Sequence, residues 1–215
     1  MRWVAALVSG GLDSLVLVAT LRARGWRVVP VYVRQGLRWE GAERYWLRRW
    51  LKSLRGVDPL VELNLPVRDL YGRHWSMGGY VPRAADPDEA VYLPGRNLLL
   101  IAEAGVLAAQ RGIPAIALGT LRGNPFADAT PQFRRQVGRV LQTALGKPLR
   151  VMAPLARFTK GQVIRRGRAM LLEQTFSCLQ PRGQRHCGVC QKCGERRRGF
   201  RETGVPDKTR YVKVE

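Results

Sequence analysis

The residues near the start of the chain that are best suited to chemistry lie at 9–14, where the sequence reads Ser-Gly-Gly-Leu-Asp-Ser. The apolar run at 3–8 favours a buried parallel strand, because it is short and glycines follow it. A second apolar run from Leu15 favours a helix, with Asp13 and Ser14 at its expected cap positions. Such a strand–turn–helix directs backbone N–H groups and the positive end of the helix to one point. The segment therefore predicts a phosphate-binding loop.

The order of residues in this loop distinguishes it from the Walker loop, which needs Gly-x-x-x-x-Gly-Lys-Ser/Thr. It instead resembles the Ser-Gly-Gly-x-Asp-Ser pattern of the pyrophosphate-loop (PP-loop) ATPases. Those enzymes cleave ATP between the α and β phosphates and leave AMP on a substrate oxygen. The resemblance implies AMP-forming chemistry, and the alternative is an ordinary strand–helix turn that binds no ligand.

All four cysteines of the chain lie in one short segment with the spacing C-x8-C-x2-C-x2-C: Cys178, Cys187, Cys190 and Cys193. In a cytosolic protein such clustering favours a metal site over disulfides. Four thiolates complete a tetrahedral zinc site and leave no open position, so a bound zinc would be structural. An iron–sulfur cluster takes the same ligands and stays open as the alternative.

Two glycines and a histidine lie among these cysteines. Gly188 and Gly194 each follow a cysteine, where a tight turn around a metal is expected to need a positive φ. His186 precedes Cys187 and is a possible substitute ligand. Because four thiolates are already present, we expect His186 to be a bystander.

The elements that position these residues alternate between strands and helices. Strands are expected at 3–8, 26–33, 60–65, 115–119 and 150–153, and helices at 15–21, 40–54, 98–110, 131–145 and 160–170. The second helix is expected to present Tyr45, Trp46, Trp50, Leu51 and Leu54 on its apolar face. The long connection at 66–94 is typical of a lid, a binding loop or disorder.

This alternation predicts an α/β fold, a doubly wound parallel sheet of about five strands with right-handed crossovers. Ligands of such sheets bind at the carboxyl ends of strands, where Ser9, Val33 and Gly119 are expected. We expect residues 1–215 to form a single domain that includes a zinc-binding element at 175–200.

The chain carries a net charge of +21, with a sequence pI near 11.2. One interpretation is a surface that binds nucleic acid, such as tRNA, or another acidic macromolecule. The other is an arginine-rich composition combined with a site for a small anion, and charge alone does not choose between them. No apolar run approaches the length of a membrane span, so we expect no membrane contact and a cytoplasmic location.

Three further stretches extend the resemblance to one family. They are 93–97 (Leu-Pro-Gly-Arg-Asn), the cysteine segment from Thr175 to Cys193, and the tail at 199–211. With the PP-loop, they resemble 7-cyano-7-deazaguanine synthase over nearly the whole chain. That family activates 7-carboxy-7-deazaguanine with ATP, lets ammonia form the amide, and dehydrates the amide to a nitrile with a second ATP. Its product leads to queuosine in tRNA.

The resemblance implies roles for individual residues. Asp13, Ser14, Lys160 and Asp128 are expected to be catalytic, and Lys160 to reach the phosphates. ATP, assisted by Mg²⁺, is expected to contact Val8, Ser9, Gly10, Gly11, Leu12, Asp13, Ser14, Val33, Arg96, Asn97, Gly119 and Lys160. Zn²⁺ would be the structural metal. The expected partners are a deazapurine carboxylate, an amine donor and a second copy of the chain in a homodimer.

Two segments depart from the family. Where it usually has Tyr-Pro-Asp-Cys-Arg-Pro-Glu-Phe, residues 126–133 keep the Asp, a Pro and a Phe but have Ala129 and Thr130 for the Cys and the Arg. Where it commonly has Tyr-Gly-Gln-Arg-His, residues 34–38 read Arg-Gln-Gly-Leu-Arg. These changes leave open whether the product is a nitrile, an amide or a conjugate with a larger amine.

The leading hypothesis is therefore an ATP-dependent ligase that forms carbon–nitrogen bonds. One alternative is a paralogue that transfers the activated deazaguanine to an amine on a macromolecule, in defence or nucleic-acid modification. A second is a tRNA-modifying PP-loop enzyme, although thiolation needs cysteines outside a structural site and none remains. A third is a non-catalytic zinc-bearing module, which an intact loop and Lys160 disfavour.

Overall fold

The structure is a computed structural model that describes residues 2–212. The strands are β1 (Arg2–Leu7), β2 (Trp26–Arg34), β3 (Val61–Asn64), β4 (Ala115–Ala117) and β5 (Arg150–Met152). The α-helices are α1 (Leu12–Ala23), α2 (Glu40–Ser53), α3 (Arg68–Tyr71), α4 (Arg96–Gln110), α5 (Pro131–Leu145), α6 (Lys160–Arg166) and α7 (Gln191–Thr203). Short 3-10 turns lie at η1 (Asp88–Val91), η2 (Ala127–Ala129) and η3 (Leu172–Gln174).

The five strands described within 2–212 form a sheet in the order β3-β2-β1-β4-β5, and every neighbouring pair is parallel. The doubly wound α/β fold predicted from the sequence is confirmed. The order reverses at β1, so the connections leaving β1 and β4 diverge at the carboxyl edge of the sheet. Such a divergence opens a crevice in which ligands bind.

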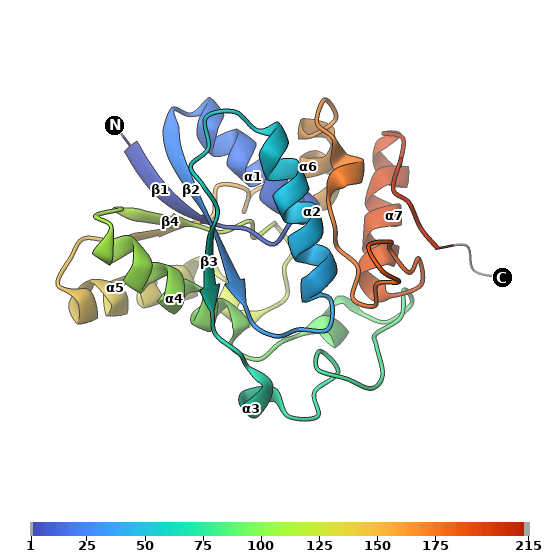
Figure 1. The fold of residues 1–215 in the computed structure, drawn as a ribbon, viewed down its shortest axis with the longest axis horizontal. Coiled ribbons are helices and arrows are strands. Elements are labelled where there is room, and N and C mark those ends of the chain that lie inside the picture. The colour runs from blue at the N-terminus through green and yellow to red at the C-terminus, as the bar shows by residue number, and fades with distance from the viewer. Residues whose placement is uncertain (1, 213–215) are drawn as a thin grey trace.

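Helices cover both faces of the sheet (Figure 1). Side chains alternate along β1, so that Val4 and Ala6 pack in one apolar cluster while Ala5 and Leu7 pack in another. The first cluster includes residues of α1, α2, α6 and α7, and the second includes residues of α4 and α5. The buried runs read from the sequence thus serve two cores, one on each face.

Local sequence signals set the bounds of two helices. The Thr130 hydroxyl accepts the Phe133 N–H and caps α5, which ends before Gly146 in the left-handed conformation. A capping box between Thr159 and Gln162 starts α6. The expected end of α6 at residue 170 is wrong, because the helix ends at Arg166.

Two further expectations about helices are wrong. Helix α1 begins at Leu12 with Gly11 as its N-cap and has no side-chain cap. The Ser14 hydroxyl instead accepts the Ser9 N–H at 3.0 Å. On α2, Tyr45 is 46% exposed, and the buried face includes Glu43. None of the helices described between residues 2 and 212 has the length and apolar character that crossing a membrane requires.

Candidate active site

A cleft of about 540 Å³ lies at the carboxyl ends of β1 and β4. The loops that follow these two strands form part of it, and the N-terminal residues of α4 and α6 and one face of α7 complete the wall. Phe176 and Ser177, near the start of the cysteine segment, line the cleft as well. The cleft therefore occupies the crevice that the strand order creates.

The shape of the PP-loop depends on a glycine and a serine pair. Gly10 has a φ of 75°, and a Cβ placed there would lie 2.7 Å from the Glu43 carbonyl oxygen of α2. No larger residue fits this position without moving backbone. The Ser9 and Ser14 hydroxyls lie 3.2 Å apart and tie the first residue of the loop to α1. Packing and hydrogen bonds thus hold the loop in one conformation.

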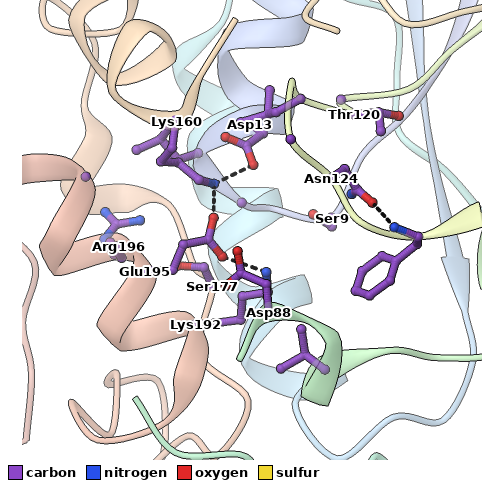
Figure 2. A pocket seen from close by; sticks show the side chains of 18 of the residues that line it. Ser9, Asp13, Asp88, Thr120, Asn124, Lys160, Ser177, Lys192, Glu195 and Arg196 are labelled. Atoms are coloured by element: carbon purple, nitrogen blue, oxygen red, sulfur yellow. Dashed lines mark hydrogen bonds and ion pairs between the residues drawn. The ribbon is translucent and has the colours of Figure 1, made fainter. Parts of the chain in front are cut away.

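Lys160 lies between two carboxylates in the cleft, as Figure 2 shows. Its Nζ lies 2.7 Å from Asp13 Oδ2 and 3.0 Å from Glu195 Oε1, and Lys192 Nζ lies 2.6 Å from the other Glu195 oxygen. Burial lowers the pKa of Lys160, but both carboxylates outweigh it and raise that pKa above its usual value. Burial likewise raises the pKa of Glu195, but the two lysines outweigh it and hold that pKa well below its usual range.

Two buried polar atoms in the cleft have no hydrogen-bond partner among residues 2–212. They are Asp13 Oδ1 and the Ser177 hydroxyl, and both residues line the cleft. Buried polar atoms are nearly always paired in folded proteins. An unpaired carboxylate oxygen beside a phosphate-binding loop is a suitable ligand for a hard cation.

Asp128 organises the start of α4. Its Oδ2 accepts the Asn97 N–H at 2.9 Å, and its Oδ1 accepts the Asn97 side-chain amide at 3.1 Å. Arg96 donates from Nε to the Gln35 side-chain oxygen at 2.9 Å. These bonds connect the loop after β2, the start of α4 and η2, and they place Arg96, Asn97 and Asp128 on the cleft wall.

One part of the cleft wall is aromatic. Trp39 and Trp75 stack with ring centroids 5.5 Å apart and an interplanar angle of 19°, and both line the cleft. Trp75 belongs to the long connection at 66–94, which therefore supplies a cleft wall, as a binding loop does. A flat wall of this kind suits a planar heteroaromatic ligand.

A buried carboxyl group faces the cleft from α2. Glu43 is 7% exposed, and its Oε2 accepts a hydrogen bond from the Tyr32 hydroxyl at 2.8 Å. Burial raises the pKa of Glu43 to about 7, although Arg96 and the Tyr32 hydrogen bond act in the opposite direction. A carboxyl group with this pKa is suited to exchanging protons near neutral pH.

The four cysteines come together, as their spacing predicts. Their Sγ atoms all lie within 4.8 Å of one another, and all four residues are buried. Backbone N–H groups point at the sulfurs, among them Cys187 N–H to Cys178 Sγ at 3.2 Å and Cys190 N–H to Cys187 Sγ at 3.4 Å. Such donors stabilise thiolates over thiols. The cluster is therefore prepared to hold a metal ion.

The glycines of this segment have two different functions. Gly188 has a φ of 82°, as expected for a metal turn. The expectation of a positive φ at Gly194 is wrong, because Gly194 is helical and its missing side chain instead admits Ala84, whose Cβ would lie 2.7 Å from an added Cβ. His186 lies outside the cluster, and its Nε2 accepts the Ser177 N–H at 3.2 Å. Burial lowers the pKa of His186 to about 3.

The family profile described as queuosine biosynthesis protein QueC matches residues 4–204. The chain belongs to the QueC family. It is 33% identical to a 7-cyano-7-deazaguanine synthase of Methanoculleus marisnigri, over 98% of this chain and 99% of that protein. A 7-cyano-7-deazaguanine synthase of an Anaeromyxobacter species is 34% identical over 96% of this chain and 94% of its own length. The family predicted from the sequence is confirmed.

Among solved structures, the QueC-family chain is similar to a 4-thiouridine synthetase crystallised in complex with RNA and bound ATP. The TM-score is 0.53 at 19% identity, and the match covers 96% of this chain and 51% of that chain. At this identity the similarity concerns the fold alone.

The two segments that the sequence analysis expected to depart from the family pattern make structural contacts in this QueC-family chain. Thr130 caps α5, and the Ala129 carbonyl oxygen accepts a hydrogen bond from the Arg134 guanidinium at 2.6 Å. Arg34 pairs with Glu40, and Arg38 donates to the Gly79 carbonyl oxygen. None of these residues lines the cleft. The arginines that do so are Arg96, Arg122, Arg196 and Arg198.

Most residues predicted to bind ATP line the cleft. They are Ser9, Gly11, Leu12, Asp13, Arg96, Asn97, Gly119 and Lys160, joined by Asp128 from the predicted catalytic set. Val8, Gly10, Ser14 and Val33 do not line it, and the first three belong to the loop and helix start behind it. Sequence reasoning missed the cleft residues Trp39, Trp75, Glu43, Arg122, Lys192 and Glu195. Glu195 lies two residues after the last cysteine, but nothing in the sequence pairs it with Lys160.

Proposed function

We propose that this chain is an ATP-dependent ligase that activates the carboxylate of 7-carboxy-7-deazaguanine as an acyl-adenylate and joins it to an amine. With ammonia the product is the amide, which a second ATP converts to the nitrile. The observation that carries the proposal is the cleft, in which a PP-loop and a lysine lie with a stacked tryptophan pair. Membership of the QueC family supports it, as do relatives named 7-cyano-7-deazaguanine synthase.

The polar part of the cleft is proposed to hold the nucleotide. Backbone N–H groups at residues 9–14 and the start of α1 bind phosphate oxygens. Lys160 turns from its two carboxylates toward the phosphates and offsets charge that develops as pyrophosphate leaves. Mg²⁺ prefers carboxylate oxygens and would be held by Asp13, whose Oδ1 is buried and unpaired within residues 2–212. Asp128 acts as a positioning residue, since Asn97 uses both of its oxygens.

The aromatic part of the cleft is proposed to hold the acid. The bicyclic ring of 7-carboxy-7-deazaguanine is planar and packs against the Trp39–Trp75 pair. Arg122 is exposed on the loop after β4 and has no ion-pair partner in the described part of the chain. An arginine of this kind recognises a planar carboxylate in a bidentate manner. Arg122 therefore takes over carboxylate recognition that Thr130 cannot provide.

Glu43 is proposed to accept the proton that the attacking amine loses. It is buried in the cleft wall, and the Tyr32 hydroxyl orients it. A carboxylate whose pKa is near neutral is basic enough to accept a proton, and at neutral pH a large fraction of the molecules still carry it in the ionised form. This step moves a proton from the amine nitrogen to a Glu43 oxygen as the carbon–nitrogen bond forms and AMP leaves.

The cysteine cluster is proposed to hold one structural Zn²⁺. A tetrahedral ion with Zn–S bonds of about 2.3 Å places its sulfurs about 3.8 Å apart. The Cys187–Cys193 and Cys178–Cys190 sulfurs lie 4.0 and 3.9 Å apart. This spacing fits one ion, whereas a cluster of several iron atoms needs sulfurs farther apart. Zinc bound there would stabilise the segment without taking part in the reaction.

Ammonia is the proposed amine, and a larger amine on a macromolecule is the second candidate. The larger amine is favoured by position 130, where this chain has Thr130 and the family resemblance implies an Arg. The Thr130 side chain caps α5 and does not line the cleft. The small side chains of Ala127 and Ala129 do not widen the cleft, because neither lines it.

Thiolation of tRNA is not proposed, because the sequence has no cysteine outside the cluster.

We also propose that residues 1–215 act as one domain. One apolar cluster contains Trp39 and Val91 from the cleft wall together with the four cysteines. It supports this proposal because it joins the cleft wall to the cysteine segment. The family resemblance is the ground for the proposed homodimer. The proposed cytoplasmic location is supported by the four cysteines, which form no disulfide in the described residues. Sedimentation of the purified chain tests the dimer.

The deciding experiment is ATP–pyrophosphate exchange with a panel of carboxylic acids, followed by mass analysis of the product. We expect exchange that depends on 7-carboxy-7-deazaguanine and yields AMP. Exchange with a different acid alone, or ADP as the sole nucleotide product, would overturn the proposed function.

A further inference from the structure

A second cavity, of about 400 Å³, shares no lining residue with the cleft. Helix α2 forms one wall with Tyr45, Trp46 and Arg49. The other walls come from η3, from the loop between the first two cysteines and from the tail near residues 208–210. The cavity thus lies where three segments distant in sequence meet, and the proposed ligase reaction makes no use of it.

The aromatic wall of this cavity combines an anchored ring with an accessible one. Tyr45 and Trp46 meet edge to face with ring centroids 5.4 Å apart. The Trp46 indole N–H donates to the Gln184 carbonyl oxygen at 2.7 Å, and the ring packs against the cluster that contains the cysteines. Tyr45 is 46% exposed. One ring is therefore anchored, and it supports a second ring that is accessible to a ligand.

The charge of the cavity is strongly positive. Four cations line it, namely Arg49, Arg185, Lys208 and Arg210, all exposed. None of them forms an ion pair with any residue from Arg2 to Val212, whereas Arg44 and Arg48 on the same helix both pair with Glu62. The carboxylate in the lining is Glu173. Unpaired cations of this number repel one another unless an anion joins them.

We propose that this cavity binds an unpaired nucleotide of a single-stranded nucleic acid. The base stacks on Tyr45, and the neighbouring phosphates lie along Arg185, Lys208 and Arg210. Aromatic stacking beside a positive groove is how single strands are bound without sequence preference. In a duplex the base faces are stacked on one another and cannot stack on Tyr45. An inorganic anion would bind the cations but would make no stacking contact with the exposed ring.

The test is the fluorescence anisotropy of a labelled, mixed-sequence RNA strand of about 12 nucleotides, titrated with the full chain. Tyr45→Ala should weaken binding about tenfold, and Tyr45→Phe, which keeps the ring, should bind within about twofold of wild type. The double variant Lys208→Gln/Arg210→Gln should reduce the slope of log affinity against log salt by about 1.4. Tyr45 is exposed, so its replacement leaves the core intact.

A matched charge control comes from the other face of the sheet. Arg135 and Arg139 on α5 are exposed and unpaired within residues 2–212, so Arg135→Gln/Arg139→Gln removes the same charge. If this control variant loses as much affinity for the RNA as Lys208→Gln/Arg210→Gln does, the binding is a diffuse electrostatic attraction and the proposal is overturned. Unchanged binding by Tyr45→Ala would overturn it too. The proposal would also be overturned if duplex RNA, heparin or AMP displaced the labelled strand as well as unlabelled single-stranded RNA does. An absence of binding to the labelled strand would overturn it as well.

Discussion

Replacing Glu43 by Gln is expected to stabilise the protein while it slows amide formation. The neutral amide keeps an oxygen that accepts the Tyr32 hydrogen bond and has nearly the same volume. Burial is the main reason that the pKa of Glu43 rises, and the nearby Glu40 carboxylate adds to the effect. Arg96 and the Tyr32 hydroxyl oppose it. A carboxyl group whose pKa is higher in the folded state costs stability once it ionises.

The pKa of Glu43 sets the size and sign of this effect. Its pKa rises from 4.5 to about 7 on folding. At about 1.36 kcal/mol per pKa unit, ionised Glu43 costs about 3 kcal/mol. The cost is absent well below the unfolded pKa, grows as pH rises through the interval between the two values, and is complete above the folded pKa. The gain from Glu43→Gln should therefore be about 2 kcal/mol larger at about pH 8 than at about pH 5.5.

Urea unfolding of wild type and Glu43→Gln at both pH values measures this difference. Glu40→Gln is the matched control on the same helix, because Glu40 pairs with Arg34 at 3.0 Å and accepts the Gly36 N–H. Its loss should destabilise the protein. In single-turnover assays Glu43→Gln should keep pyrophosphate exchange and lose about 100-fold in amide formation. A pH-independent change in unfolding free energy would refute the electrostatic reasoning, and unchanged amide formation would refute the role as base.

Three other outcomes are expected. Asp13→Asn should lower ATP–pyrophosphate exchange about 100-fold, since preorganised charge at a reacting phosphate contributes about 3 kcal/mol, and exchange within threefold of wild type would contradict the role of this carboxylate. Metal analysis should find one zinc per chain in wild type and none in Cys187→Ser, which should unfold at a much lower temperature because structural zinc contributes on the order of 10 kcal/mol; iron with a visible absorption band would contradict zinc. With 7-carboxy-7-deazaguanine, ATP and ammonia, the amide should accumulate ahead of the nitrile, and mass analysis that shows complete conversion to nitrile would prove the change at Thr130 neutral.

The parts of the fold that the sequence predicts are those that local signals determine. Residues 9–14 and the four cysteines carry their chemistry in short spacings, and both are where they were expected. Helix α5 has the predicted bounds, because Thr130, Pro131 and Gly146 mark its ends. Strand positions follow from buried apolar runs that differ from their polar surroundings.

The cleft walls could not be read from the sequence, because they depend on contacts between distant segments. Trp39 and Trp75 come from different connections and meet only when the sheet has formed. Periodicity places Glu43 on α2 but does not show that it faces inward while Tyr45 faces outward. In an arginine-rich chain, one charged residue such as Glu195 resembles any solvated residue until its partner is known.

Helix α7 connects the cysteine cluster to the cleft. Cys190 is its N-cap, Cys193 lies in its first turn, and Glu195 follows within the same turn and a half. A metal held by both cysteines would fix the position and the rotation of the helix start. Gly199 then allows close approach, since an added Cβ would lie 2.9 Å from the Lys160 side chain. The glycine contact and the 3.0 Å ion pair between Glu195 and Lys160 join α7 to the start of α6. A metal bound by the cysteines would therefore act on the cleft through α7, because this helix carries Glu195 to Lys160.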